Sequence, residues 1–348
     1  MRLLLRQQRP AGAAPEFAPG VCMTADATLR SSSVDRRFAV IIGRICALAM
    51  GLISATASAQ HTPTQTALPV VVNPLPAPPD RHPRARVLLA DYRYDDLLWE
   101  NDKTAHRIYG LALEKAEPPS GSGIDSWGKN VAWPFADRQL RGGDQHSYHG
   151  EGMDFYHVGT TRGAGGLGIW YDNKLWTSRN YSKYRILQTG AVADFEVDYA
   201  PWPVDVVRKV WETRRFTLPL GTHFTRMVST IRSDLSDPLI VGIGIGKRPT
   251  SGRAGSVTID RPRGILSWWG PDEPEHGRMM VALKVDPEMI AEIREDADNY
   301  LVLLKVQPGQ PFVYYSGSAW NLGQDHVNSR EAWDKLVAAE TVDFDPAH

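Results

Sequence analysis

The polar residues that could carry out chemistry are concentrated in one glycine-rich stretch, residues 146–157. It contains His149, Glu151 and Asp154, with a glycine on each side of Glu151. Imidazole and carboxylate groups in this arrangement fit two kinds of site. They can bind a divalent metal ion such as zinc, calcium or manganese, which is the one cofactor that the stretch suggests. They can also exchange protons with a sugar. The alternative is a solvated loop that the glycines only bend.

A second polar cluster lies at residues 99–110. If its end is a strand, side chains alternate between faces, so Arg107 and Tyr109 point together to one face and His106 points to the other. An arginine beside a tyrosine can neutralise a substrate carboxylate and supply a phenolic proton. An exposed edge strand with salt bridges is the alternative interpretation.

Several further residues are candidates for holding a sugar. Arg162 is a second cation that could meet a carboxylate, and Asp154 and Tyr156 could orient the ligand. The chain has 11 tryptophans, some of which could stack on a flat sugar face, although most tryptophans of a β protein are core. The candidates for such a stacking wall are Trp170, Trp268, Trp269, Trp320 and the neighbouring Asn321.

One motif has the glycine spacing of a nucleotide site but not its surroundings. Residues 163–168 match the pattern G-x-G-x-x-G. A dinucleotide site needs a helix after this pattern, so that the pyrophosphate meets the helix N-terminus. Residues 169–176 predict a hairpin instead. The glycines therefore indicate a tight bend or a close approach of strands.

The elements that must position these residues are mostly strands. Apolar residues alternate with acidic ones over 193–199, and similar short runs recur to residue 316, separated by Gly, Pro, Asn and Asp. A helix is expected over 329–340, with Asn328 able to cap it and Glu331 at the capping-box position, and a shorter helix over 288–295. The pattern predicts an all-β fold, a large antiparallel sandwich of two sheets with a short C-terminal helix.

The N-terminus has the pattern of an export signal. Basic residues at 36–37 precede an apolar run to residue 53, and Ala57-Ser58-Ala59 offers a cleavage site. We expect residues 1–59 to be a signal peptide with an N-terminal extension, 60–83 a flexible lead-in, and 84–348 a single domain. Both cysteines, Cys22 and Cys46, would leave with the signal. The protein would then be periplasmic or extracellular, with no transmembrane anchor after processing.

The ordered set of motifs resembles a bacterial family known as domain of unknown function 4861. The similar stretches are residues 99–110, 122–129, 149–156, 158–168, 298–304, 308–315 and 318–321. Members of the family often have a cysteine where this chain has Ala164. The resemblance implies a β-supersandwich of the galactose-mutarotase type. It also implies a role beside enzymes that degrade uronate-containing polysaccharides.

These observations predict an exported enzyme that acts on an acidic oligo- or polysaccharide. The near-neutral charge of the chain, −1, argues against nucleic acid as a partner. We favour β-elimination over hydrolysis. A non-catalytic carbohydrate-binding protein and a sugar mutarotase or epimerase are the alternatives. Elimination needs a neutralising cation, a base and an acid. The candidates are Arg107 and Arg162 as cations, His149 or His106 as base, Tyr109 or Tyr156 as acid, and Glu151 and Asp154 as orienting groups or metal ligands. Five residues of the set are expected to converge in one concavity: Arg107, Tyr109, His149, Glu151 and Arg162.

Overall fold

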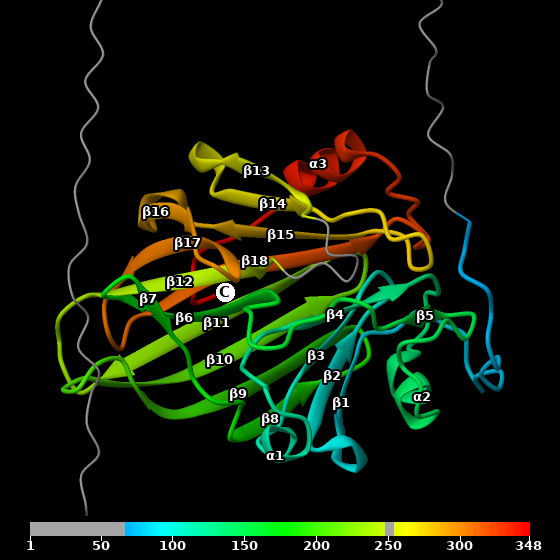
Figure 1. Ribbon diagram of the computed structural model, residues 1–348, viewed down its shortest axis with the longest axis horizontal. Coiled ribbons are helices and arrows are strands. Elements are labelled where there is room, and N and C mark those ends of the chain that lie inside the picture. Colours follow the sequence, from blue (N-terminus) through cyan, green and yellow to red (C-terminus); the bar gives the residue numbers. More distant parts are fainter. Residues whose placement is uncertain (1–66, 248–253) are drawn as a thin grey trace, which may run out of the picture. The chain divides into compact units, whose positions relative to one another are not determined.

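Three antiparallel sheets form the framework of the computed structural model, which describes residues 67–247 and 254–348 (Figure 1). The expected signal peptide lies outside the described residues. The largest sheet has eight strands in the order β13-β14-β15-β18-β11-β10-β9-β8. Its strands are β8 (Lys183–Gln188), β9 (Val192–Pro203), β10 (Lys209–Pro219), β11 (Phe224–Ser233), β13 (Ser256–Asp260), β14 (Ile265–Trp269), β15 (Met279–Val285) and β18 (Pro311–Trp320).

Two smaller sheets of five strands each complete the set. One has the order β16-β17-β12-β6-β7 and contains β6 (Ala164–Tyr171), β7 (Lys174–Trp176), β12 (Leu239–Gly246), β16 (Ile290–Glu295) and β17 (Asn299–Val306). The other runs in chain order through β1 (Arg86–Ala90), β2 (Asp96–Glu100), β3 (Ala105–Ile108), β4 (Asp125–Lys129) and β5 (Gly152–Met153). The expected hairpin after residue 168 is confirmed, because β6 and β7 pair.

Both five-stranded sheets pack on the same face of the large sheet. Alternate residues of β18 make the contacts: the Tyr314 hydroxyl donates to the Gly165 carbonyl of β6, and the hydroxyl groups of Ser126 in β4 and Ser318 are hydrogen-bonded. Apolar side chains of all three sheets form one core between the layers. A bridge between Ile124 and Gly163 joins the two smaller sheets. The predicted two-layer β-sandwich is therefore confirmed, with its second layer divided into two sheets.

The helices are few and short within the described residues. They are α1 (Leu113–Ala116), α2 (Ala136–Arg141) and α3 (Arg330–Ala339), with 3-10 turns at Asp91–Arg93, Arg261–Arg263 and Pro287–Met289. The C-terminal helix is confirmed, but its cap is Ser329, not Asn328, because the Ser329 hydroxyl accepts from the Ala332 backbone. Trp333 of α3 is fully buried against the outer face of the large sheet.

The shorter helix expected over 288–295 is wrong. This segment is a 3-10 turn followed by β16, which pairs with β17 from Ile290 to Glu295. Its spacing of apolar residues fits either structure. Pairing with β17 at the sheet edge overrides the local helix preference. Within the described part of the chain, no helix is long and apolar enough to cross a membrane.

Candidate functional site

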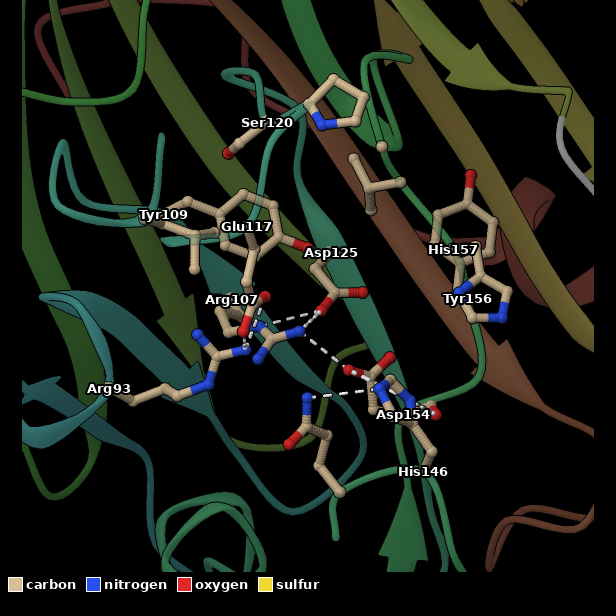
Figure 2. A pocket seen from close by; sticks show the side chains of 15 residues that line it. Arg93, Arg107, Tyr109, Glu117, Ser120, Asp125, His146, Asp154, Tyr156 and His157 are labelled. Atoms are coloured by element: carbon tan, nitrogen blue, oxygen red, sulfur yellow. Dashed lines mark hydrogen bonds and ion pairs between the residues drawn. The ribbon is translucent and has the colours of Figure 1, made fainter. Parts of the chain in front are cut away.

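A polar cavity of about 200 Å³ opens on the outer face of the β1–β5 sheet, close to α1 (Figure 2). We call it the central cavity. Strands β3 and β4 supply its floor, and the chain that leaves β5 supplies one wall. Its lining residues are Arg93, Arg107, Tyr109, Leu113, Glu117, Pro119, Ser120, Asp125, Gln145, His146, Asp154, Tyr156, His157, Val158 and Gly159.

Arg107 is the centre of the floor and is almost completely buried. Its Nη2 atom lies 2.8 Å from Oδ2 of Asp125 and 2.8 Å from Oδ2 of Asp154. Its Nη1 atom lies 3.6 Å from Oδ2 of Asp96. Asp125 comes directly opposite Arg107 in the β3–β4 register, so strand pairing itself creates the first of these contacts. One guanidinium thus faces three buried carboxyl groups.

The carboxylate of Asp125 is firmly held by donors. Oδ2 accepts from Nε and Nη2 of Arg107 and from Nε1 of Trp127, and Oδ1 accepts from the Ser126 backbone. Such a set of donors fixes the position of the carboxylate. Asp125 is therefore the fixed acceptor of the cavity.

Asp154 has a different environment, although it shares the same guanidinium. It follows β5 directly and is 3 % exposed. Its carboxyl group accepts a hydrogen bond from Arg107 and lies 3.9 Å from Nδ1 of His146. Burial, together with the charge of Asp125, raises the pKa of Asp154 well above its usual range, against the opposing effect of Arg107. The cavity therefore contains two carboxyl groups in different environments, and the environment of Asp154 favours its protonated form.

Asp96 lies beneath the floor and is fully buried. Neither of its carboxyl oxygens has a hydrogen-bond partner in the structure. Burial raises the pKa of Asp96 to about 7, against the lowering effect of Arg107 and Arg93. The raised pKa values of Asp96 and Asp154 reduce the excess of negative charge around the single guanidinium.

Two histidines lie at the exposed rim, next to Asp154 (Figure 2). The rings of His146 and His157 are 6.0 Å apart. Nδ1 of His146 lies 2.9 Å from the backbone carbonyl of Asp154, and a carbonyl can only accept, so this nitrogen carries the hydrogen. Nε2 of His146 is then the acceptor, 3.3 Å from the Gln145 amide nitrogen. The rim therefore offers an imidazole nitrogen that acts as an acceptor, with the Gln145 amide as its partner.

The remaining ionisable groups are two phenols and an ion pair. Burial raises the pKa of both Tyr109 and Tyr156, so they stay protonated and can act only as donors. The Tyr109 ring also lies 5.1 Å from the Arg107 guanidinium. At the rim Arg93 bonds to Glu117 at 2.8 Å, and the Glu117 side chain is half exposed.

The structure brings together four of the residues singled out in the sequence: Arg107, Tyr109, Asp154 and Tyr156. Two others from the glycine-rich stretch lie elsewhere. Both ring nitrogens of His149 contact backbone carbonyls, those of Val72 and Asn73 on one side and of Asp144 on the other. Glu151 accepts from the Trp133 indole and pairs with Arg138 of α2. The expected convergence is therefore only partial.

His149 thus fastens the segment before β1 to the body of the domain. We expect His149→Ala to lower the free energy of unfolding by about 1–3 kcal/mol, because the carbonyl oxygens of Val72, Asn73 and Asp144 lose the partly buried ring that links them. Cleavage within residues 67–80 by a protease at low concentration should accelerate. Turnover of a substrate too small to reach the segment before β1 should stay within about twofold, whereas a catalytic role predicts its loss by about 10²–10⁴. His82→Ala, at a fully exposed ring, is the matched control.

Arg162 and His106 also lie outside the central cavity. Arg162 is buried, and its guanidinium donates to Ser122 and to the Leu167 and Thr160 carbonyls, so it joins β6 to the preceding loop. His106 points to the opposite face of β3 from Arg107, as the strand alternation predicts, and stacks on Trp99 at 5.1 Å. Burial lowers the pKa of His106 to about 3, so it is neutral.

The aromatic candidates do not form a wall around the central cavity. Trp268 is buried against Tyr156, and Trp320 is buried with its indole donating to the His276 carbonyl. Trp269 lies under the guanidinium group of Arg278. The backbone amide of Arg278 donates to the side chain of Asn321. Trp170 lines a separate cavity beside Arg162.

Sequence reasoning did not select Asp125, Asp96, Arg93 or the two rim histidines as site residues. Two features of the sequence could have indicated them: Asp125 lies in the motif 122–129, and His146 and His157 are the first and last residues of the glycine-rich stretch. As for the suggested metal ion, residues 67–247 and 254–348 contain no group of three or more His, Cys, Asp or Glu side chains arranged to hold one.

Comparison with known proteins identifies the family of this chain and several proteins that are similar to part of it. The family model described as "Domain of unknown function (DUF4861)" matches residues 56–345. "Uncharacterized protein P7" of Formosa agariphila is 30% identical over 262 residues, which are 70% of this chain and 64% of that protein. The chain thus spans less than two thirds of the length of this relative.

Two solved structures align with the chain only loosely. They are GH36 alpha-galactosidases of Geobacillus stearothermophilus: AgaB, and AgaA in complex with raffinose. AgaB is 11% identical with a TM-score of 0.32, and the alignment covers 67% of this chain and 41% of the enzyme. AgaA is 10% identical with a TM-score of 0.29, and its alignment covers 65% and 40%. Values this low support no inference about function.

Proposed function

The chain belongs to the DUF4861 family, and from its central cavity we propose that it is an exported carbohydrate-active enzyme that cleaves a glycosidic bond beside a uronate by β-elimination. The observation that carries the proposal is the position of Asp154: its carboxyl group lies inside a polar cavity and is held by the same guanidinium nitrogen as Asp125. Burial and the charge of Asp125 raise the pKa of Asp154, the direction of shift that suits a group protonating a leaving oxygen.

The second group available for proton transfer is an imidazole rather than a carboxylate. Asp125 already accepts four hydrogen bonds, which leaves it a poor nucleophile. His146 has its Nδ1 hydrogen directed to a carbonyl, which leaves Nε2 able to accept a proton. An imidazole base with a carboxylic acid suits elimination, whereas retaining hydrolysis needs a second, available carboxylate.

In the proposed step His146 removes the proton from C5 of the uronate. The electron pair forms the C4–C5 double bond as the C4–O bond breaks. The oxygen leaves on the neighbouring sugar and takes the proton of Asp154. Arg107 already faces the carboxyl groups of Asp96, Asp125 and Asp154, so we assign the uronate carboxylate to another cation. Arg93 at the rim is our candidate, because its partner Glu117 is half exposed and can move aside.

The experiment that tests this function is incubation of the purified protein with pectic, alginate, ulvan and glucuronan substrates. Ultraviolet absorbance and reducing ends are recorded together, and the Asp154→Asn variant serves as the blank. We expect absorbance and reducing ends to rise in parallel, because elimination creates both a conjugated double bond and a new chain end. Reducing ends without absorbance would replace elimination by hydrolysis. Substrate binding with neither signal would favour a carbohydrate-binding protein.

A further inference from the structure

A second cavity of about 480 Å³ adjoins the central one. We call it the outer cavity. Its walls include Val70 and Val72 from the segment before β1, Ser147 and Tyr148 from the loop before β5, and His276. His146 lines both cavities, so the two spaces meet at the imidazole proposed as the base.

The walls of the outer cavity suit the face of a sugar ring. Tyr148 is buried, its hydroxyl accepts from the Asn130 amide, and its ring packs edge-on against Trp320 at 6.0 Å, so the ring is held in place. Nδ1 of His276 lies 3.3 Å from Oε2 of Glu273. Aliphatic side chains complete the lining, and Ser147 adds a polar edge. Rigid rings, aliphatic carbon and a few polar groups are the ordinary components of a ligand site.

The wall formed by residues 67–72 is attached rather than loose. The Val72 backbone amide donates to the Tyr148 carbonyl at 2.9 Å, and His149 contacts the Val72 and Asn73 carbonyls. His149 therefore holds the outer wall, although it does not reach the central cavity.

The two cavities differ in size and character. The central cavity, about 200 Å³ and lined by ionisable groups, has room for one sugar ring. The outer cavity is larger and more apolar. The volume of the central cavity suits one ring, and the outer cavity, which shares His146 with it, is the adjoining space large enough for the next one.

We propose that the substrate is the end of a uronate oligosaccharide: its terminal residue fills the central cavity and the next residue fills the outer cavity, so that the linkage crosses His146. This inference rests on the proposed function. In β-elimination the bond that breaks is between C4 of the uronate and the oxygen of its neighbour. The neighbour lies in the outer cavity, so the uronate in the central cavity carries the free reducing end. Each turnover then releases one unsaturated monosaccharide.

Product size tests the inference. A uronate oligosaccharide of four to six residues is digested with wild-type protein, and the earliest products are separated by mass. We expect a single unsaturated residue and a substrate shortened by one. A second sample carries a bulky fluorophore on its reducing end, and its turnover should fall at least tenfold. Early unsaturated products of mixed length, or equal cleavage of the labelled chain, would overturn the inference while leaving the proposed function intact.

Variants of the outer wall supply an independent readout. Ser147→Trp should raise KM for the oligosaccharide about tenfold, equivalent to about 1.4 kcal/mol of lost binding. The inhibition constant of the free monouronate, which binds only the central cavity, should stay within about twofold. His276→Ala replaces Ser147→Trp if that variant fails to fold, and Val206→Trp, at a fully exposed position, is the matched control.

The outcomes separate the two proposals. If both constants change together, or neither changes, the outer cavity is not the second subsite. If the residues preceding 67 occupy it instead, a chain starting at residue 67 would bind the oligosaccharide more tightly than the chain starting at 60, which also overturns the inference. If no unsaturated product arises from any uronate substrate, the proposed function itself fails.

Discussion

Asp154→Asn is expected to lower turnover by about 10²–10⁴, the range typical for loss of a positioned acid or base. The amide has the size of the carboxyl group and its oxygen can still accept from Arg107. It cannot deliver the proton that the leaving oxygen requires. Because substrate contacts are retained, KM should change far less than kcat.

The stability of the same variant separates a catalytic role from a structural one. Asp154 is buried beside the anion Asp125, so its charge is unfavourable in the folded protein. The neutral amide should leave the free energy of unfolding unchanged or slightly higher. Asp144→Asn, at an exposed carboxylate of the preceding loop, is the control and should change neither activity nor stability. Turnover within threefold of wild type in a folded Asp154→Asn protein would remove Asp154 as the acid.

The pH profile of wild-type kcat gives a further check. The acid must be protonated to act, so activity falls as pH rises through its pKa. Because burial raises that pKa, activity should persist to higher pH than an ordinary aspartic acid would allow. The residual activity of Asp154→Asn should lack this alkaline limb.

The fold could be predicted largely from local patterns. Alternation of apolar and polar residues identifies the strands of the large sheet, because one of its faces is buried in the core. The same alternation correctly separates Arg107 and Tyr109 from His106 on β3. It does not reveal that the second layer is two sheets joined by one bridge, Ile124 to Gly163, since that depends on contacts between distant segments.

The candidate site could be predicted only in part, because its members meet through strand register. Asp125 reaches Arg107 as its cross-strand neighbour, and no local pattern encodes that pairing. The density of polar residues in the glycine-rich stretch indicates a functional site, but it does not show which of these side chains face the same cavity. Gly150 has φ of +102°, a conformation that favours glycine, so the chain turns there. His149 and Glu151 consequently face other elements, while Asp154 faces the cavity.

Arg107→Met is expected to be the most destabilising change in the site, lowering the free energy of unfolding by about 3–5 kcal/mol. Methionine fills much of the volume, but it leaves Asp125, Asp154 and Asp96 buried without their shared cation. Urea unfolding followed by tryptophan fluorescence measures the loss. Arg185→Met is the control, because Arg185 is largely exposed on β8 and its pair with Glu196 should contribute under about 1 kcal/mol. A loss no larger than that of the control would contradict the central role of Arg107.

The free energy of unfolding depends on pH because of the buried acids around Arg107. The pKa of Asp96 is about 7 in the folded protein and near 4 when unfolded, so the folded state binds the extra proton between these values. Stability therefore decreases as pH rises from about 4 to 7, with a slope of up to about 1.4 kcal/mol per pH unit for each such proton. Arg107 lowers the pKa of both Asp96 and Asp154, so without it these two pKa values rise further and the decrease should become steeper and extend to higher pH. Adding Asp154→Asn to Arg107→Met removes one of these acids, and the double variant should recover part of the lost stability. Simple additivity of the two changes would mean that Arg107 and Asp154 do not interact energetically.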